Sequence, residues 1–111
     1  MWYGNPSLPL PDPAVGDLFV ANLGMLYKVR PVLVLEHFGG GTCIVAKLTT
    51  SEREDNVCYL HQGEGGLNGG GFVSRNRFGI CRDHLRRRLG AVGSDVMRWV
   101  DAAEMDKVVW L

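Results

Sequence analysis

The fold is decided by residues 29–51, which read VRPVLVLEHFGGGTCIVAKLTTS. This stretch holds two apolar runs, residues 32–35 and 42–49, and both are rich in β-branched side chains. Runs of this length, bounded by glycine or polar residues, are typical of buried strands rather than helices. Three consecutive glycines, Gly39–Gly41, lie between the runs and indicate a turn. The stretch therefore predicts two strands joined by a short turn.

The same pattern of a short apolar run recurs along the chain in five further segments. They are residues 18–21, 56–60, 71–74, 89–92 and 108–111. Each is short, apolar and bounded by turn-forming or charged residues, so each predicts a strand. Many short strands in one small chain favour a mainly β fold, namely a strongly bent β-barrel.

One helix is predicted, near the C-terminus. Residues 95–105 place Val96, Trp99, Val100 and Ala103 at the i, i+3, i+4, i+7 spacing of a single apolar face. Ser94 is a suitable N-cap, and Asp95 suits the positive end of the first turn. We expect this helix to pack on the sheet, and a short helical turn to form within residues 83–88.

The composition indicates one folded domain. The chain has 111 residues, of which 46% are hydrophobic and 22% charged. Four of its five prolines lie in residues 1–13, which predicts an extended arm, followed by a single domain over residues 14–111. No apolar run approaches the ~18 residues of a membrane helix, and the first residues lack signal-peptide features. A cytoplasmic protein with no membrane association is expected.

The cysteines and histidines suggest no metal or disulfide site. Cys43, Cys58 and Cys81 form no CxxC pair, and the three histidines have no ligand spacing to them or to carboxylates. We expect buried, reduced thiols, surface histidines, and no metal or other cofactor.

The zero net charge conceals a pattern along the chain. Residues 75–93 contain six arginines and one aspartate and carry a charge of +5, whereas residues 1–74 carry −3 and residues 94–111 carry −2. Arginine suits bidentate contacts with phosphate and stacking on bases. Two interpretations stay open: a surface that contacts phosphate, or a solvated face whose charges pair with Asp101, Glu104 or Asp106.

The glycine-rich segment 63–71 has no Gly-Lys-Ser/Thr step into a helix and no surrounding βαβ unit, so it is not a nucleotide-binding loop. It predicts a flexible hairpin connection, or a mobile loop beside a substrate groove.

A candidate anion site involves Arg30 and Thr49. Pro31 suits the beginning of a strand, which places Arg30 at the mouth of the barrel. Thr49, Thr50 and Ser51 end the next predicted strand with three hydroxyls. If the two strands pair, the guanidinium and the hydroxyls come together and can bind an anion. The alternative is a solvated arginine at a strand end.

The order of these motifs resembles the MazF/PemK family of toxins from type II toxin–antitoxin systems. The matching stretches span about residues 16–105: GDLFVANL (16–23), VRPVLVL (29–35), TCIVAKLTTS (42–51), GEGGLNGGGFV (63–73) and RLGAVGSDVMRWV (88–100).

The resemblance implies an SH3-like β-barrel of the MazF/CcdB type, usually a homodimer. It also implies metal-independent, sequence-specific cleavage of single-stranded RNA to 2′,3′-cyclic phosphate and 5′-hydroxyl ends. Arg30 and Thr49 match the family's catalytic pair. Lys28, Ser51, Arg75 and Arg77 are further candidate RNA contacts. The implied protein partner is an antitoxin whose disordered tail covers the groove.

Two features depart from the family pattern. The loop at residues 24–29 is shorter than usual, and Asn76-Arg77-Phe78 stands where the family commonly has Gln-Ile-Arg. They keep open a non-enzymatic alternative: a gyrase-binding toxin of the same fold, or an inactive barrel that serves as an interaction module. Gyrase-binding relatives end their terminal helix in a Trp-Gly-Ile-type sequence, which Trp110-Leu111 matches poorly.

Overall fold

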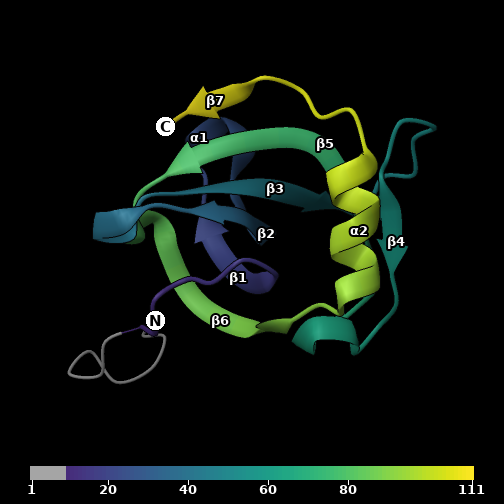
Figure 1. Cartoon of the computed structure of the whole chain (residues 1–111), viewed down its shortest axis with the longest axis horizontal. Helices are drawn as coiled ribbons and strands as arrows, with labels where there is room; N and C mark the ends of the chain where they lie inside the picture. The colour runs from purple at the N-terminus through teal and green to yellow at the C-terminus, as the bar shows by residue number, and fades with distance from the viewer. Residues whose placement is uncertain (1–9) are drawn as a thin grey trace.

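The computed structural model describes residues 10–111 and contains one curled sheet. Its strands are β1 (Asp17–Asn22), β2 (Val29–His37), β3 (Cys43–Thr49), β4 (Cys58–Leu60), β5 (Gly71–Ile80), β6 (Leu85–Ala91) and β7 (Val108–Trp110). The strand order is β4-β5-β3-β2-β1-β6, with antiparallel neighbours throughout. β7 pairs with β5 in parallel. Figure 1 shows this sheet bent into an open barrel, which confirms the expected fold.

Helices are few and short in the described part of the chain. They are α1 (Gly24–Tyr27) and α2 (Ser94–Ala102), with 3₁₀ turns at Gly39–Gly41, Glu64–Gly66 and Arg82–His84. None of the helices within residues 10–111 is long and apolar enough to cross a membrane.

Two apolar clusters hold the sheet, one against each face. Phe19, Val32, Val45 and Phe78 are central to one, and Leu85 completes it from β6. The other includes Leu18, Leu33 and Leu48 together with Val96 and Val100 of α2. Since neighbouring residues of a strand point to opposite faces, the continuous apolar runs of β1, β2 and β3 supply both clusters.

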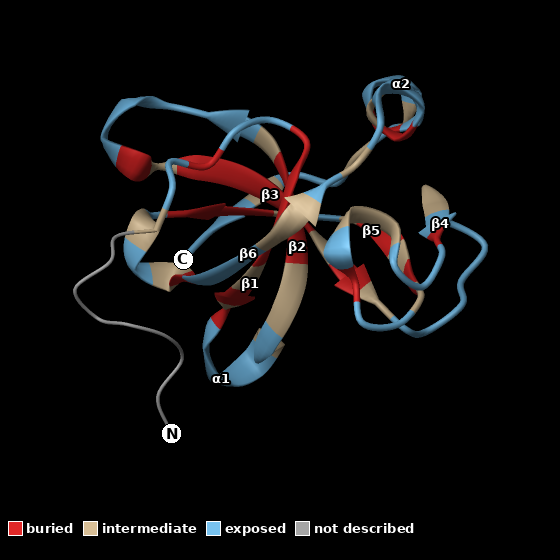
Figure 2. Cartoon of the chain, turned by 90° about the horizontal axis from the view of Figure 1, so that it is seen from below, coloured by how far each residue is buried: buried red, intermediate tan, exposed pale blue. Residues whose placement is uncertain are grey.

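The C-terminal helix is confirmed, with different bounds and a different N-cap. It covers Ser94–Ala102 instead of residues 95–105, and Gly93, not Ser94, is the N-cap residue. Val96 and Val100 are buried as expected, but Trp99 is 52% exposed, and Figure 2 shows only one side of α2 buried. The helix ends early because the chain after it returns to β5, where the Asp106 N–H donates to the Arg75 carbonyl at 3.0 Å.

Strands β5 and β6 are longer than predicted. β5 continues to Ile80, and β6 begins at Leu85, so the predicted helical turn at residues 83–88 is largely wrong. Three exposed arginines, residues 86–88, obscured the strand pattern. β6 lies at the edge of the sheet, where charged side chains are common because they discourage pairing with another chain.

The glycine-rich segment joins β4 to β5, which pair as an antiparallel hairpin. Its first half also packs on β6. A Cβ atom at Gly66 would collide with the Leu89 carbonyl, and one at Gly90 with the Gly65 carbonyl. Gly65 and Gly66 both have positive φ, so glycine is required there for its conformation and its lack of a side chain. The segment thus bridges the space between the two edges of the sheet.

The beginning of the described chain lies against the barrel. Arg82 donates to the Leu10 carbonyl and forms an ion pair with Asp12 at 2.5 Å. Leu10 packs on the cluster around Phe19, and Pro13 is buried. Residues 1–9, most of the predicted proline-rich arm, lie outside the described residues.

Candidate functional site

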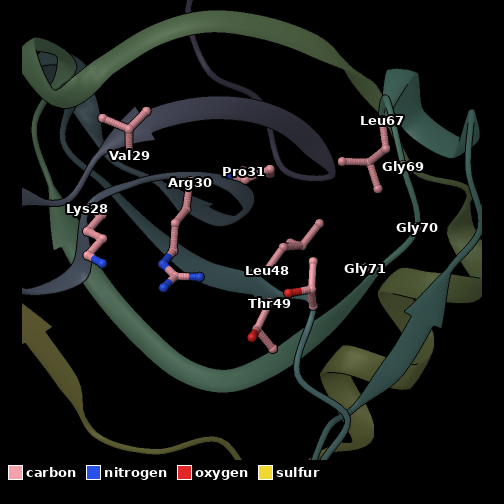
Figure 3. A pocket seen from close by; sticks show the side chains of 11 residues that line it. Lys28, Val29, Arg30, Pro31, Leu48, Thr49, Leu67, Gly69, Gly70 and Gly71 are labelled. Atoms are coloured by element: carbon pink, nitrogen blue, oxygen red, sulfur yellow. The ribbon is translucent and has the colours of Figure 1, made fainter.

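Arg30 and Thr49 come to one place through the strand register. β2 and β3 pair with Val34 opposite Val45, Leu33 opposite Ala46 and Val32 opposite Lys47. The same register, continued by two residues, places Arg30 opposite Thr49. Residues opposite each other share a face of the sheet, so the guanidinium and the hydroxyl project to the same side. Figure 3 shows both side chains directed into one open space.

Local structure orients the Arg30 side chain. Its Nε donates to the Tyr27 carbonyl oxygen of α1 at 2.8 Å, and its two terminal nitrogens make no hydrogen bond within residues 10–111, so they can face the open space. The Tyr27 ring in turn packs against Phe78, with ring centroids 4.6 Å apart. The short helix α1, which was not predicted, therefore anchors the guanidinium to the core. The ladder between β2 and β3 stops at Val32, directly after Pro31, which has no N–H to donate.

Two adjoining grooves share Arg30 and Thr49. The apolar groove has a volume of about 320 Å³ and lies between β2, the end of β3 and the glycine-rich segment. Besides the shared pair, its walls include Lys28, Leu48, Leu67 and Gly70.

The second, polar groove has a volume of about 230 Å³ and lies toward β5. Four cationic side chains, Arg30, Lys47, Arg53 and Arg75, line it together with one carboxylate, that of Asp55. Thr49 and Ser51 add hydroxyls to its wall, and the Thr49 Oγ1 accepts the Ser51 N–H at 3.1 Å. The excess of positive charge makes this groove a suitable site for a phosphate or another anion.

Lys47 is a site residue that the sequence interpretation missed. It is half-buried in the polar groove, and its Nζ lies 5.9 Å from the centroid of the Tyr27 ring. Burial, followed by the charges of Arg30 and Arg53, lowers the pKa of Lys47. The alternation of residues 47–49 was the available signal, because it places Lys47 and Thr49 on one face of a strand.

The other predicted site residues are not all at the grooves. Ser51 and Arg75 line the polar groove, and Lys28 lines the apolar groove. Lys28 has a φ of 67°, a backbone conformation that is rare for residues other than glycine. Arg77 lines neither groove, and its Nε donates to the Asp106 carbonyl at 2.7 Å.

The arginine-rich segment does not act as one surface. Arg75 and Arg77 bind backbone carbonyls of the segment after α2, Arg82 holds the chain near Leu10, and Arg88 pairs with Asp17 at 3.0 Å. Of the three acidic residues considered as partners in one of the two open interpretations, Glu104 and Asp106 accept through their main-chain carbonyls, and among residues 10–111 no ion pair joins these arginines to the carboxylates of Asp101, Glu104 or Asp106. Only Arg75 of this segment joins the polar groove.

The cysteines differ in burial: Cys43 is buried, Cys58 is half-buried, and Cys81 is exposed, which corrects the expectation of three buried thiols. All three are free. His37 and His61 are exposed, while His84 is half-buried and its Nδ1 lies 3.4 Å from the Cys81 Sγ. Within residues 10–111, no group of three or more His, Cys, Asp or Glu side chains could hold a metal ion.

Comparisons with known proteins identify structures with the same fold. A scan against protein-family models and a search of curated proteins find no match to the sequence. Among the solved structures that are similar to this chain, three illustrate the shared fold. The Mycobacterium tuberculosis toxin MazF-mt6 has a TM-score of 0.67 at 25% identity, over 82% of this chain and 99% of that one.

The other two structures are endoribonucleases from mycobacterial species. One has a TM-score of 0.62 at 19% identity, over 83% of this chain and 86% of that one. The other, in complex with its cognate antitoxin, has a TM-score of 0.63 at 22% identity, over 80% and 87%. The chain has the fold of MazF toxins, so the resemblance inferred from the sequence is confirmed.

Proposed function

We propose that this protein is a toxin endoribonuclease that cleaves single-stranded RNA at the site formed by Arg30 and Thr49. The observation that carries the proposal is their meeting at the junction of two grooves, one of them lined by four cationic side chains. Two solved structures that share the fold are endoribonucleases.

The site supports a reaction in which the RNA supplies its own nucleophile. The 2′-hydroxyl loses its proton as its oxygen attacks the adjacent phosphorus, the bond from phosphorus to the 5′-oxygen breaks, and the 5′-oxygen gains a proton, so that protons balance over the step. The products are a 2′,3′-cyclic phosphate and a 5′-hydroxyl, and no metal ion is required. The protein must then position the phosphate and stabilise the charge on its oxygens.

Each residue has a role that follows from its chemistry. The terminal nitrogens of Arg30 form a planar fork that matches two phosphate oxygens. The Thr49 hydroxyl can donate one further hydrogen bond to the phosphate, and Lys47 adds a positive charge from the same groove. Ser51, Arg75 and Lys28 extend the binding surface to neighbouring nucleotides.

We further infer a homodimer in the cytoplasm that is neutralised by an antitoxin. One structural neighbour is an endoribonuclease in complex with its cognate antitoxin. A disordered, acidic antitoxin tail would suit the positive polar groove and would block access to Arg30. Cleavage of a particular RNA sequence belongs to the same proposal.

The test is incubation of the purified protein with a long single-stranded RNA in the presence of EDTA. We expect fragments with 5′-hydroxyl ends, and their loss in Arg30→Ala. Arg98→Ala is the matched control, because Arg98 is an exposed arginine on α2. Intact RNA across diverse sequences would overturn the proposal and would favour the non-enzymatic interaction module.

The gyrase-binding alternative has little structural support. The C-terminal segment Val108–Trp110 is strand β7, paired with β5, and not the end of a helix. The Trp110 ring lies so close to Gly79 that a Cβ atom there would collide with it. Inhibition of DNA gyrase together with intact RNA would restore this alternative.

A further inference from the structure

Three side chains form one row across the sheet, and Arg30 lies at the end of that row. Tyr59 of β4 is in register with Phe72 of β5, and Phe72 is in register with Thr49 of β3. The ladder between β2 and β3 ends at Val32 opposite Lys47, and Arg30, two residues before Val32, meets Thr49 where both line the two grooves. Because residues in register share a face, two aromatic rings lie on the same side of the sheet as the proposed catalytic pair.

The aromatic end of this row is open to solvent. The Tyr59 side chain is 44% exposed, and Phe72 is half-buried. Their ring centroids are 4.9 Å apart in an edge-on arrangement, and the centroids of the His61 and Tyr59 rings are 5.1 Å apart. The rings support one another instead of packing into either apolar cluster, neither of which includes them.

The glycine-rich segment fixes the position of Tyr59. A Cβ atom at Gly70 would collide with the Tyr59 Oη, so this glycine permits the close contact. Gly70 also lines the apolar groove beside Arg30 and Thr49. The segment therefore connects the aromatic pair to the groove and holds the ring in place.

We propose that Tyr59 and Phe72 form a stacking site for an unpaired base of the RNA whose phosphate lies between Arg30 and Thr49. This site, the aromatic platform, rests on the function proposed above and adds a base-binding position to it. Unpaired bases stack on aromatic side chains in single-stranded nucleic acid complexes, and they do so with little dependence on sequence.

The spacing of the row suits one nucleotide. Neighbouring strands are about 4.8 Å apart, so Phe72 lies about one strand and Tyr59 about two strands from Thr49. A base linked through its ribose to a phosphate at Thr49 can reach across that interval. The base and the phosphate would then be bound by adjacent parts of one face.

The test is binding of a fluorescent, single-stranded oligonucleotide pool of mixed sequence with 2′-O-methyl sugars. These sugars lack the free 2′-hydroxyl, so binding is measured without cleavage. We expect Tyr59→Leu to weaken binding by about tenfold, within the range for loss of one stacked base. Tyr59→Phe keeps the ring and should bind within about twofold of the unmodified protein.

Two matched controls separate stacking from general disturbance. Gly70→Ala should weaken binding by displacing the Tyr59 ring, whereas Gly39→Ala should not, because a Cβ atom at Gly39 meets nothing within 4 Å and Gly39 lines neither groove. Phe38→Leu should also bind normally, since Phe38 is 43% exposed and follows the far end of β2. Thermal unfolding of each variant checks that the fold is kept.

The outcomes distinguish this inference from the function on which it rests. Normal binding by Tyr59→Leu, with RNA cleavage that still depends on Arg30, would overturn the aromatic platform and leave the nuclease proposal in place. An unmodified protein that neither binds nor cleaves RNA would overturn both. Weak binding in Tyr59→Leu and Gly70→Ala, with rescue in Tyr59→Phe, supports the platform.

Discussion

Arg30 and Lys47 place two positive charges in the same groove, and the pKa of Lys47 is lowered by burial and then by the charges of Arg30 and Arg53. A lowered pKa means that the folded protein disfavours the charged ammonium. The Lys47 ammonium therefore costs stability at every pH at which the folded protein keeps it protonated. The arrangement is expected of a site that binds an anion, since a bound phosphate would relieve the repulsion.

Lys47→Met should therefore stabilise the free protein and weaken its binding to RNA. Methionine keeps the length of the side chain and removes the charge. In the unmodified protein, the destabilisation by the Lys47 ammonium is fully present below its folded-state pKa and diminishes as the pH rises through that pKa. The difference in the free energy of unfolding between Lys47→Met and the unmodified protein should therefore be greater near neutral pH than at high pH. Urea unfolding at several pH values and oligonucleotide binding measure the two effects.

Lys107→Met is the control, because Lys107 is exposed and lines neither groove. If Lys47→Met lowers stability at neutral pH, the electrostatic account of this groove is wrong.

Removal of the Thr49 hydroxyl should slow cleavage more than removal of the hydroxyl of the adjacent Thr50. Thr49→Val has a similar shape but cannot donate to a phosphate, and we expect kcat/KM to fall by about tenfold or more. Thr49→Ser keeps the hydroxyl and should retain most of the activity. Thr50→Val provides the comparison, because Thr50 lines the apolar groove but is absent from the polar groove. Equal losses in Thr49→Val and Thr50→Val would contradict the role assigned to Thr49.

Arg30→Lys should be almost as damaging as Arg30→Ala. Lysine keeps the positive charge but loses both the planar fork and the Nε donor that holds the side chain to the Tyr27 carbonyl. We expect kcat to fall by about 10²- to 10³-fold, the usual cost of removing a donor to a developing oxyanion. A lysine variant with near-normal kcat would show that charge alone suffices and that the orientation of the fork is unimportant.

The curled sheet could be predicted from the sequence because its central strands are continuous apolar runs. Leu33, Ala46 and their neighbours along these strands are buried, some on one face of the sheet and some on the other. A strand that is covered on both faces needs apolar residues at successive positions, which gives a continuous apolar run. The Arg30 and Thr49 pairing followed from the same strands, since each residue lies at a strand end.

The missed features depend on contacts between distant segments. α2 stops at Ala102 because the following residues return to Arg75 and Arg77, a tertiary effect that helical periodicity does not contain. Lys47 resembled an ordinary polar residue in a strand until the bend of the sheet brought it beside Arg53 and Arg75. The local sequence pattern predicts helices and strands, whereas the grooves depend on how those helices and strands contact one another in the folded protein.

The buried carboxylate of Asp17 should be a structural requirement. It is 7% exposed, its Oδ2 accepts the Ala14 N–H at 3.0 Å, and its Oδ1 accepts from Arg88 at 3.0 Å. Asp17→Asn removes the charge from both contacts and should lower the free energy of unfolding by about 2 kcal/mol, measured in urea. Asp101→Asn on the exposed face of α2 should change it by less than about 0.5 kcal/mol. Comparable values for the two variants would argue against the role of Asp17.

The three thiols should react with iodoacetamide in the order Cys81, Cys58, Cys43. Cys81 is exposed, whereas burial, and then the neighbouring Cys81, raise the pKa of Cys43 to about 11. Burial, followed by the charges of Glu64 and Asp95, also raises the pKa of Cys58. Because the thiolate is the nucleophile, a pKa of about 11 leaves about one part in a thousand of Cys43 reactive near pH 8.

Mass spectrometry of labelled peptides at intervals measures this order directly. In the folded protein near pH 8, Cys81 should be modified first and Cys43 should remain protected. Raising the pH increases the thiolate fraction of Cys43, but burial still limits its access to the reagent. In urea the three rates should converge, because unfolding removes both the burial and the neighbouring charges. Labelling of Cys43 as fast as that of Cys81 in the folded protein would mean that the cluster around Phe19, to which Cys43 belongs, opens readily in solution.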